Sequence, residues 1–289
     1  MIIREALAQG SADLKFAEIK TPNLDASLLL AHVLKKSRTE LIAAGTDKIP
    51  EKACAAFCEL IERRAGGECI AYITGKKEFR GLEFNVNPSV LVPRPDTETL
   101  VETALQTADS YKSNLNVLDL CTGSGAVAVS LKNECPELNI TATDISAEAL
   151  EIAKANAARL LAENNIQFYK GDLFDALVNS SVQNQYHMFH IIVSNPPYIP
   201  SDEISTLSEE VQNEPRLALD GGACGLLVIK RIIDKAPDYL HKGGTLLLEA
   251  DPSQMDEITL LLKKRGFTNA QVYNDLSGLQ RVIGAIYEN

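Results

Sequence analysis

The sequence predicts an α/β fold: a mostly parallel sheet closed by an antiparallel hairpin, preceded by a small all-helical domain and a β-hairpin linker. Apolar strand-like runs alternate with helix-like stretches from about residue 94 onward, whereas residues 1–75 have helical periodicity throughout. The last two strand-like runs are joined by a connection too short for a helix. Alternating strands and helices indicate a parallel sheet covered on both faces, and a short connection forces antiparallel pairing.

The carboxyl-terminal part carries the pattern of the sheet. Its expected parallel strands are residues 116–120, 139–144, 166–170, 188–194 and 245–249. Its expected helices are residues 126–132, 147–161, 226–240 and 254–265. Two final strands, 268–273 and 280–287, flank Asn274-Asp275-Leu276-Ser277-Gly278 and must pair antiparallel.

The amino-terminal part predicts a helical bundle. Residues 25–34 carry apolar side chains at helical spacing and are followed by two lysines, which suit the negative end of the helix dipole. Residues 51–64 repeat the pattern, and Gly66-Gly67 stops the helix.

A change of period marks the linker. Leu82, Phe84 and Val86 alternate, residues 87–89 turn the chain and residues 90–92 return, which predicts a β-hairpin. The expected organisation is therefore a bundle over 1–75 that serves substrate recognition, a linker over 76–93 and a second domain over 94–289.

Charge is unevenly distributed along the chain. The net charge is −11; residues 1–78 carry 12 Lys and Arg against 11 Asp and Glu, and the remainder carries 16 against 28. We expect no direct nucleic-acid binding, because phosphate contacts need a basic face. The pairs Lys35-Lys36, Arg63-Arg64 and Lys76-Lys77 make the amino-terminal part the better place to meet an acidic partner, although each pair alone is typical of a solvated helix face.

The cysteine and hydropathy patterns indicate the cellular compartment in which the protein is expected. The six cysteines include no CxxC pair and no His at zinc spacing, so no metal site is expected. Residues 1–5 lack the apolar core of a signal peptide, and no apolar run approaches the ~18 residues of a membrane span. The expected location is the reduced cytoplasm, without membrane association.

Asn195-Pro196-Pro197-Tyr198 directly follows the apolar run 188–194. Proline fixes φ and donates no N–H, so the segment is stiff and leaves carbonyl groups unpaired. An amide side chain, a free carbonyl and an aromatic face within four residues can hold a planar –NH2 group. An ordinary proline-rich turn is the alternative interpretation of these four residues alone.

A second candidate site follows the strand at 116–120. Cys121, Thr122, Gly123, Ser124 and Gly125 form a strand-to-helix turn in which the glycines let a ligand approach the backbone. Such turns lie at the carboxyl edge of an open α/β sheet, where ligands bind. The GxGxxG fingerprint is incomplete and no P-loop lysine follows, so a tight structural turn is the alternative.

Acidic residues at the ends of the next two strands suggest the ligand. Asp144 can accept both hydroxyls of a ribose, and Asp172 can accept the exocyclic amine of a purine. Ile145 and Leu173 can supply apolar walls. A ribose acceptor and a purine acceptor without a phosphate cradle indicate a nucleoside cofactor without phosphate, of which S-adenosylmethionine (SAM) is the common one.

These features resemble those of class I SAM-dependent methyltransferases with their Rossmann-like sheet, and more narrowly the HemK/PrmC family. The resemblance covers nearly the whole chain. The matching segments are Ala71-Tyr72-Ile73-Thr74-Gly75, Glu78-Phe79-Arg80-Gly81-Leu82-Glu83-Phe84, Val92-Pro93-Arg94-Pro95-Asp96-Thr97-Glu98 and Glu214-Pro215-Arg216-Leu217-Ala218-Leu219-Asp220-Gly221-Gly222. The chain departs from the family's pattern at Cys121, Leu173, Cys224 and Ala250-Asp251.

The resemblance implies methyl transfer from SAM to N5 of the Gln in the Gly-Gly-Gln motif of class-1 peptide-chain release factors, with S-adenosylhomocysteine as product and no metal. Asn195 Oδ1 and the Pro196 carbonyl would accept the two amide hydrogens, and Tyr198 would stack on the amide plane. Asn195 would also contact the cofactor. Arg94 and Glu98 would shape the peptide entrance, with a salt bridge or helix cap as the alternative role.

Three other activities stay open. An N6-adenine methyltransferase would use the same clamp, but the acidic second domain argues against the basic surface that base flipping needs. The complete Asn195–Tyr198 set argues against a SAM-binding regulatory module without turnover. A small-molecule methyltransferase would have little use for the additional helical domain.

Overall fold

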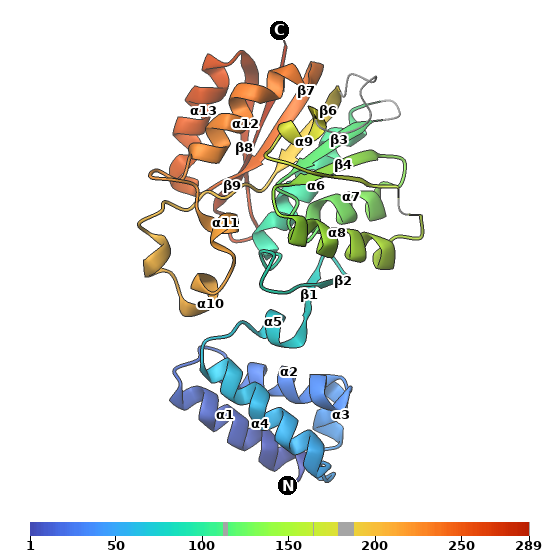
Figure 1. Ribbon diagram of the computed structural model, residues 1–289, viewed down its shortest axis with the longest axis vertical. Helices are drawn as coiled ribbons and strands as arrows, with labels where there is room; N and C mark the ends of the chain where they lie inside the picture. Colours follow the sequence, from blue (N-terminus) through green and yellow to red (C-terminus); the bar gives the residue numbers. More distant parts are fainter. Residues whose placement is uncertain (112–114, 164, 179–187, 289) are drawn as a thin grey trace. The chain divides into compact units, whose positions relative to one another are not determined.

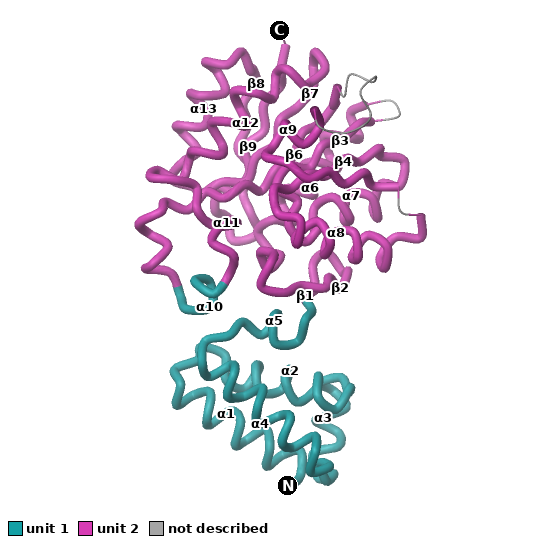
Figure 2. The backbone as a smooth tube through the Cα atoms, in the orientation of Figure 1, with its two compact units in different colours: residues 1–76, 208–213 teal, residues 77–207, 214–289 magenta. Residues whose placement is uncertain are grey.

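The computed structural model describes residues 1–111, 115–163, 165–178 and 188–288 (Figure 1). These residues divide into two compact units (Figure 2). Unit 1 comprises residues 1–76 and 208–213, and unit 2 comprises residues 77–207 and 214–289. None of the described helices is long and apolar enough to cross a membrane.

Unit 1 is a small helical bundle. Its helices are α1 (Ile3–Phe16), α2 (Pro22–Leu34), α3 (Arg38–Ala43), α4 (Glu51–Ala65), α5 (Ile70–Thr74) and the short α10 (Glu209–Gln212). Gly10 of α1 lies against the Phe57 ring, where an added Cβ would come within 2.8 Å of the ring. The sequence therefore needs glycine there for α1 and α4 to pack closely.

One basic pair in unit 1 is held by ion pairs, with Arg64 buried and Arg63 exposed. Arg64 is 3% exposed and donates to Asp25 at 2.7 Å and to Glu210 of α10 at 2.5 Å. Arg63 pairs with Glu68 through two hydrogen bonds. Arg63-Arg64 is therefore a structural pair whose charge is already neutralised, whereas Lys35 and Lys36 are exposed.

Unit 2 is built on a seven-stranded sheet in the order β5-β4-β3-β6-β7-β9-β8. The strands are β3 (Asn116–Leu120), β4 (Asn139–Asp144), β5 (Gln167–Lys170), β6 (Phe189–Ser194), β7 (Leu240–Glu249), β8 (Phe267–Asn274) and β9 (Gln280–Tyr287). Strands β3 to β7 are parallel, and β9 pairs antiparallel with both β7 and β8. The predicted fold class is confirmed.

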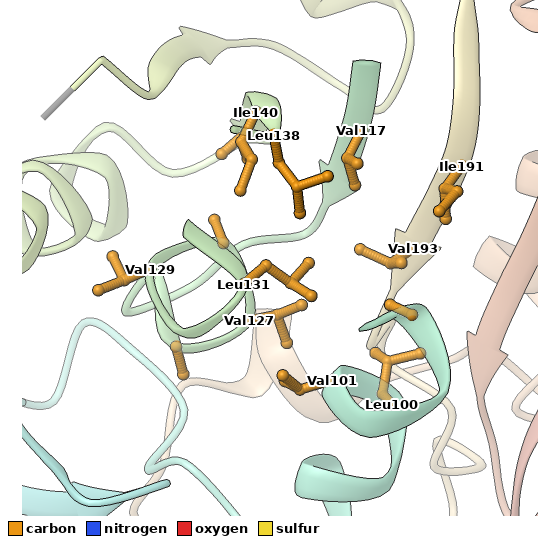
Figure 3. Packing of buried hydrophobic residues seen from close by; sticks show 14 of the residues in the cluster. Leu100, Val101, Val117, Val127, Val129, Leu131, Leu138, Ile140, Ile191 and Val193 are labelled. Atoms are coloured by element: carbon orange, nitrogen blue, oxygen red, sulfur yellow. The ribbon is translucent and has the colours of Figure 1, made fainter. Parts of the chain in front are cut away.

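Helices cover both faces of this sheet (Figure 1). They are α6 (Glu98–Asp109), α7 (Ala126–Glu134), α8 (Ala147–Leu160), α9 (Asp175–Val178), α12 (Leu227–Lys235) and α13 (Met255–Lys264). The short α11 (Arg216–Leu219) lies in the connection between β6 and α12. Successive strand residues point to opposite faces, so Val117 and Val193 join α6 and α7 in one core (Figure 3). Leu118 and Ile192 join α12 and α13 in the other.

The linker hairpin differs from the predicted one. Its strands are β1 (Lys76–Phe79) and β2 (Leu82–Asn85), and the turn is Arg80-Gly81, both with positive φ as a tight two-residue hairpin turn requires. Residues 90–92 form no strand. Val90 and Val92 are buried at alternate positions in an irregular segment, and their alternation was wrongly interpreted as a strand.

Two further boundaries were wrong. The helix predicted over 226–240 ends at Lys235, because Pro237 cannot continue the hydrogen-bond ladder and a 3-10 turn follows at Ala236–Asp238. Strand β7 begins at Leu240 instead of 245. Its first residues include exposed ones such as Lys242, which the apolar pattern did not indicate.

Candidate active site

A cavity lies at the carboxyl edge of the unit 2 sheet. Because β3, β4, β5 and β6 are parallel, their carboxyl ends meet at one edge, where ligands of open α/β sheets bind. The cavity has a volume of about 400 Å³, within the roughly 300–1,000 Å³ typical of small-molecule sites.

Most of the predicted site residues line this cavity. They are Arg94, Cys121, Thr122, Gly123, Ser124, Asp144, Ile145, Asp172, Leu173, Asn195 and Pro197. Within the described part of the chain, Gly125, Pro196 and Tyr198 are not among the lining residues. The structure therefore gathers the two candidate sites, the glycine turn and the Asn-Pro-Pro-Tyr segment, around one space.

The two glycines of the turn differ in their surroundings. Both have positive φ, but a Cβ added at Gly123 would meet nothing within 4 Å, whereas one at Gly125 would lie 3.1 Å from the Ala153 Cβ of α8. Gly123 therefore presents backbone to the cavity, and Gly125 allows α7 and α8 to pack. The buried Asn156 of α8 donates to Ser124 O at 2.9 Å and holds the turn from behind.

Asp144 closes one side of the turn. Its Oδ2 accepts the Gly123 N–H and its Oδ1 accepts the Ser146 N–H, each at 2.9 Å. Burial raises the pKa of Asp144, and the backbone hydrogen bonds oppose that rise. Each carboxyl oxygen keeps a further lone pair for a ligand hydroxyl, so the donor set and the open backbone at Gly123 fit a ribose.

Asp172 and Leu173 lie beyond the end of β5. Asp172 accepts a hydrogen bond from Arg231 of α12 at 2.8 Å, and both side chains are partly exposed. Leu173 has φ of 51° and is buried, yet it lines the cavity. Leu173 thus forms an apolar wall, with Ile145 as a more exposed counterpart. Arg231 also lines the cavity, and sequence reasoning missed it.

Asn195 is oriented by a hydroxyl that sequence reasoning also missed. Asn195 Nδ2 donates to Thr97 Oγ1 at 3.0 Å. With its nitrogen engaged, the amide leaves Oδ1 as the group available to accept a hydrogen bond. Pro196 is buried, and among the described residues no hydrogen bond reaches its carbonyl oxygen.

Tyr198 lies behind Asn195. Its ring packs against the core shared with α12 and α13, and its hydroxyl donates to Glu249 Oε1 at 3.3 Å. Burial raises the pKa of Tyr198, and the neighbouring Glu249 raises it further. The stacking of this ring on a carboxamide stays a prediction.

The segments around Arg94 and Glu214 meet at the cavity wall. Glu214 is 4% exposed; its Oε2 accepts the Val92 N–H at 3.0 Å and its Oε1 accepts from Arg94. Arg94 forms the salt bridge that was its alternative role, and both partners belong to unit 2. Glu98 accepts the Arg80 N–H at 3.5 Å and is not among the residues that line the cavity in the described ranges.

Asp119 is a further cavity residue that sequence reasoning missed. It is 1% exposed and accepts a hydrogen bond from Thr122 Oγ1 at 2.6 Å. Burial raises its pKa to about 7. A carboxylate inside the apolar strand Val117-Leu118-Asp119-Leu120 was the available signal, because buried acids are rare without a partner.

The described residues contain no cluster of three His, Cys, Asp or Glu arranged to hold a metal ion. The parallel sheet, the glycine turn followed by Asp144, and the closing antiparallel strands define a class I SAM-dependent methyltransferase. A solved methyltransferase structure from Pyrococcus furiosus has the same fold, with a TM-score of 0.50 at 18% identity, covering 79% of this chain and 98% of that one.

The sequence comparisons identify the family. The profile of the PrmC N-terminal domain matches residues 5–75, and that of the methyltransferase small domain matches residues 95–211. The release factor glutamine methyltransferase of Coxiella burnetii is 41% identical over 98% of both chains. That of Burkholderia pseudomallei is 41% identical over 90% of both chains. The chain belongs to the release factor glutamine methyltransferase family.

Proposed function

We propose that this protein transfers a methyl group from SAM to N5 of the Gln in the Gly-Gly-Gln motif of class-1 peptide-chain release factors. Relatives 41% identical over nearly the whole chain bear the name of this activity. The orientation of Asn195, with Nδ2 on Thr97 and Oδ1 left to accept, carries the proposal, because an acceptor at this place suits a substrate amide.

The cofactor would be held along the turn side of the cavity. Asp144 would accept the ribose hydroxyls, Ile145 and Leu173 would enclose the purine, and Asp172 would accept its exocyclic amine. Residues 121–125 would present their backbone to it. When bound, SAM supplies an electrophilic methyl group and leaves as S-adenosylhomocysteine; we propose no metal in this reaction.

The protein's own groups would activate the glutamine amide. An amide nitrogen is a poor nucleophile because its lone pair is delocalised into the carbonyl. Asn195 Oδ1 and the Pro196 carbonyl would each accept one N–H, which favours a pyramidal nitrogen with its lone pair free. This stabilisation is greatest in the transition state. Pro197 would keep the bend stiff, and Tyr198 would orient the amide plane.

Positioning would supply most of the remaining rate enhancement. Well-oriented reactants gain roughly 7–11 kcal/mol over free encounter. Arg94, held by Glu214, would border the entrance for the peptide. We assign recognition of the release factor to the bundle over residues 1–75 and the hairpin over 76–93, with a cytoplasmic location that suits six free thiols.

Mass spectrometry tests the function. Purified release factors incubated with the protein and SAM should gain one methyl group on the Gln of Gly-Gly-Gln. In a parallel assay with tritiated SAM, adenine-containing DNA and RNA should remain unlabelled. Label on nucleic acid with none on the release factor would replace this proposal with the N6-adenine activity.

A further inference from the structure

At the wall of the cavity and behind it, polar side chains from four separate segments lie near one another. Thr97 lies in the 3-10 turn Pro95–Thr97 before α6, Asn195 and Tyr198 follow β6, Glu249 ends β7, and Arg281 lies on β9. Thr97 is 4% exposed and Glu249 is 1% exposed. Burying a carboxyl group and a hydroxyl group away from water costs free energy unless both groups form hydrogen bonds in the folded protein.

Each hydrogen bond among these side chains has a defined donor and acceptor. Asn195 Nδ2 donates to Thr97 Oγ1 at 3.0 Å, and the Tyr198 hydroxyl donates to Glu249 Oε1 at 3.3 Å. The buried Glu249 Oε2 has no hydrogen-bond partner among the described residues. The nearby Thr97 hydroxyl nonetheless lowers the pKa of Glu249. Thr97 therefore contacts the Asn195 amide directly, and it is close enough to Glu249 to affect its ionisation.

A hydroxyl has one hydrogen. If the Thr97 hydroxyl donates this hydrogen to one neighbour, it can only accept a hydrogen bond from the other. An ionised Glu249 would accept the Thr97 hydrogen through its unpartnered Oε2, while the Thr97 oxygen accepts from Asn195 Nδ2. When Glu249 is protonated, its own hydrogen can go to Thr97, which frees the Thr97 hydrogen to donate to Asn195 Oδ1. The amide would then turn its –NH2 group toward the cavity.

We propose that Thr97 and Glu249 are positioning residues that hold the Asn195 amide with its oxygen toward the substrate. This inference rests on the proposed function, in which Asn195 Oδ1 accepts a glutamine N–H. Thr97 lines the cavity and acts on Asn195. Glu249 is not among the cavity-lining residues of the described ranges and acts through Thr97.

The charges around Glu249 make its ionisation matter near neutral pH. Burial raises the pKa of Glu249 to about 7; Thr97, Arg281 and Tyr198 oppose the rise and Asp96 adds to it. Arg281 is itself shared with Asp96 and Asp275, each at 3.2 Å. Because the carboxylate form holds the productive orientation, kcat should rise as pH increases through about 7.

The test uses the full-length protein with a release factor and tritiated SAM. Thr97→Val removes the hydroxyl and keeps the shape, and we expect kcat to fall about 10- to 100-fold, as misplacement of a reacting group costs. The Kd for SAM should change less than about twofold. Thr97→Ser keeps the hydroxyl and should recover most of the rate. Glu249→Gln should lower kcat and remove its rise near pH 7.

A second readout does not depend on turnover. In protein labelled with 15N, the side-chain –NH2 hydrogens of Asn195 should exchange with solvent more slowly in wild type and Thr97→Ser than in Thr97→Val. Wild-type kcat and pH dependence in Thr97→Val would overturn the inference. Equal losses of kcat and thermal stability in Thr97→Val and Thr97→Ser would also overturn it, because they would indicate a packing role.

The wild-type arm separates this inference from the function itself. Absence of release-factor methylation by the wild-type protein would refute the proposed function, and with it the meaning given to the Asn195 orientation. Methylation by wild type with an unaffected Thr97→Val variant would refute the inference alone.

Discussion

The two ends of the cavity are held in different ways. At the Asp144 end, side-chain oxygens bind backbone N–H groups close by in the fold, those of Gly123 and Ser146. At the Asn195 end, side chains bind other side chains from distant segments, Thr97 and Glu249 among them. Asn195 and Asp144 were both predicted from the sequence. The partners of Asp144 are backbone groups of neighbouring turns, whereas the side-chain partners at the Asn195 end come from distant segments and could not be predicted.

The largest expected effect is at the Asn195 end. Asn195→Ala removes an acceptor used in the transition state, and such losses lower kcat by about 10²- to 10³-fold. The Kd for SAM, measured by calorimetry, should stay within about threefold because Asn195 is far from the ribose acceptor in the proposed arrangement. Asn139→Ala, at the amino end of β4, is the matched control. A large loss of SAM affinity with unchanged turnover would contradict the division of roles.

The next effect is at the Asp144 end. Asp144→Asn weakens the ribose acceptor and one of its bonds to the turn, and a lost charged hydrogen bond costs about 1.5–3 kcal/mol. The Kd for SAM should therefore rise about 10- to 100-fold, while kcat at saturating SAM changes little. Calorimetry and saturating-substrate kinetics measure the two quantities separately. If the Asp144→Asn variant bound SAM with the wild-type Kd but had a lowered kcat, the two ends of the cavity would not have separate roles.

The glycines of the turn sharpen the comparison within one end. Alanine at either Gly123 or Gly125 has to adopt positive φ, which costs about 1–2 kcal/mol. Gly125→Ala also pushes on Ala153 and should lower the thermal unfolding midpoint more than Gly123→Ala. Gly123→Ala should instead show the larger loss of SAM affinity. Equal midpoints for both variants would refute the packing role of Gly125.

The last effect concerns stability and pH, at a buried acid that lines the same cavity. Burial raises the pKa of Asp119 from 3.8 to about 7, so between about pH 4 and 7 the folded protein retains a proton that the unfolded chain has lost. The free energy of unfolding should fall as pH rises through this interval, by at most about 1.4 kcal/mol per pH unit for this group. Asp119→Asn should make the fall shallower in urea titrations at several pH values. A steeper fall of the unfolding free energy in the Asp119→Asn variant would contradict the raised pKa of Asp119.

Local chemistry explains what the sequence could predict. The strands of the sheet, the turn at 121–125 and Asp144 follow from apolar runs, glycines and a carboxylate at a strand end. Thr97 and Glu249 could not be placed, because the sequence does not show which side chains from distant segments each of them meets in the folded protein. The hairpin was misplaced because Val90 and Val92 alternate in burial without pairing, and charged residues conceal β1.

The bond from Glu214 to the Val92 backbone and to Arg94 has a practical consequence for protein engineering. Residues 215–218, which include cavity-lining positions, continue directly from this glutamate. Any chimera that grafts the 214–222 loop from another family member must import the 92–98 segment with it. If only one of the two segments were exchanged, the buried Glu214 carboxylate would lose its hydrogen-bond partners.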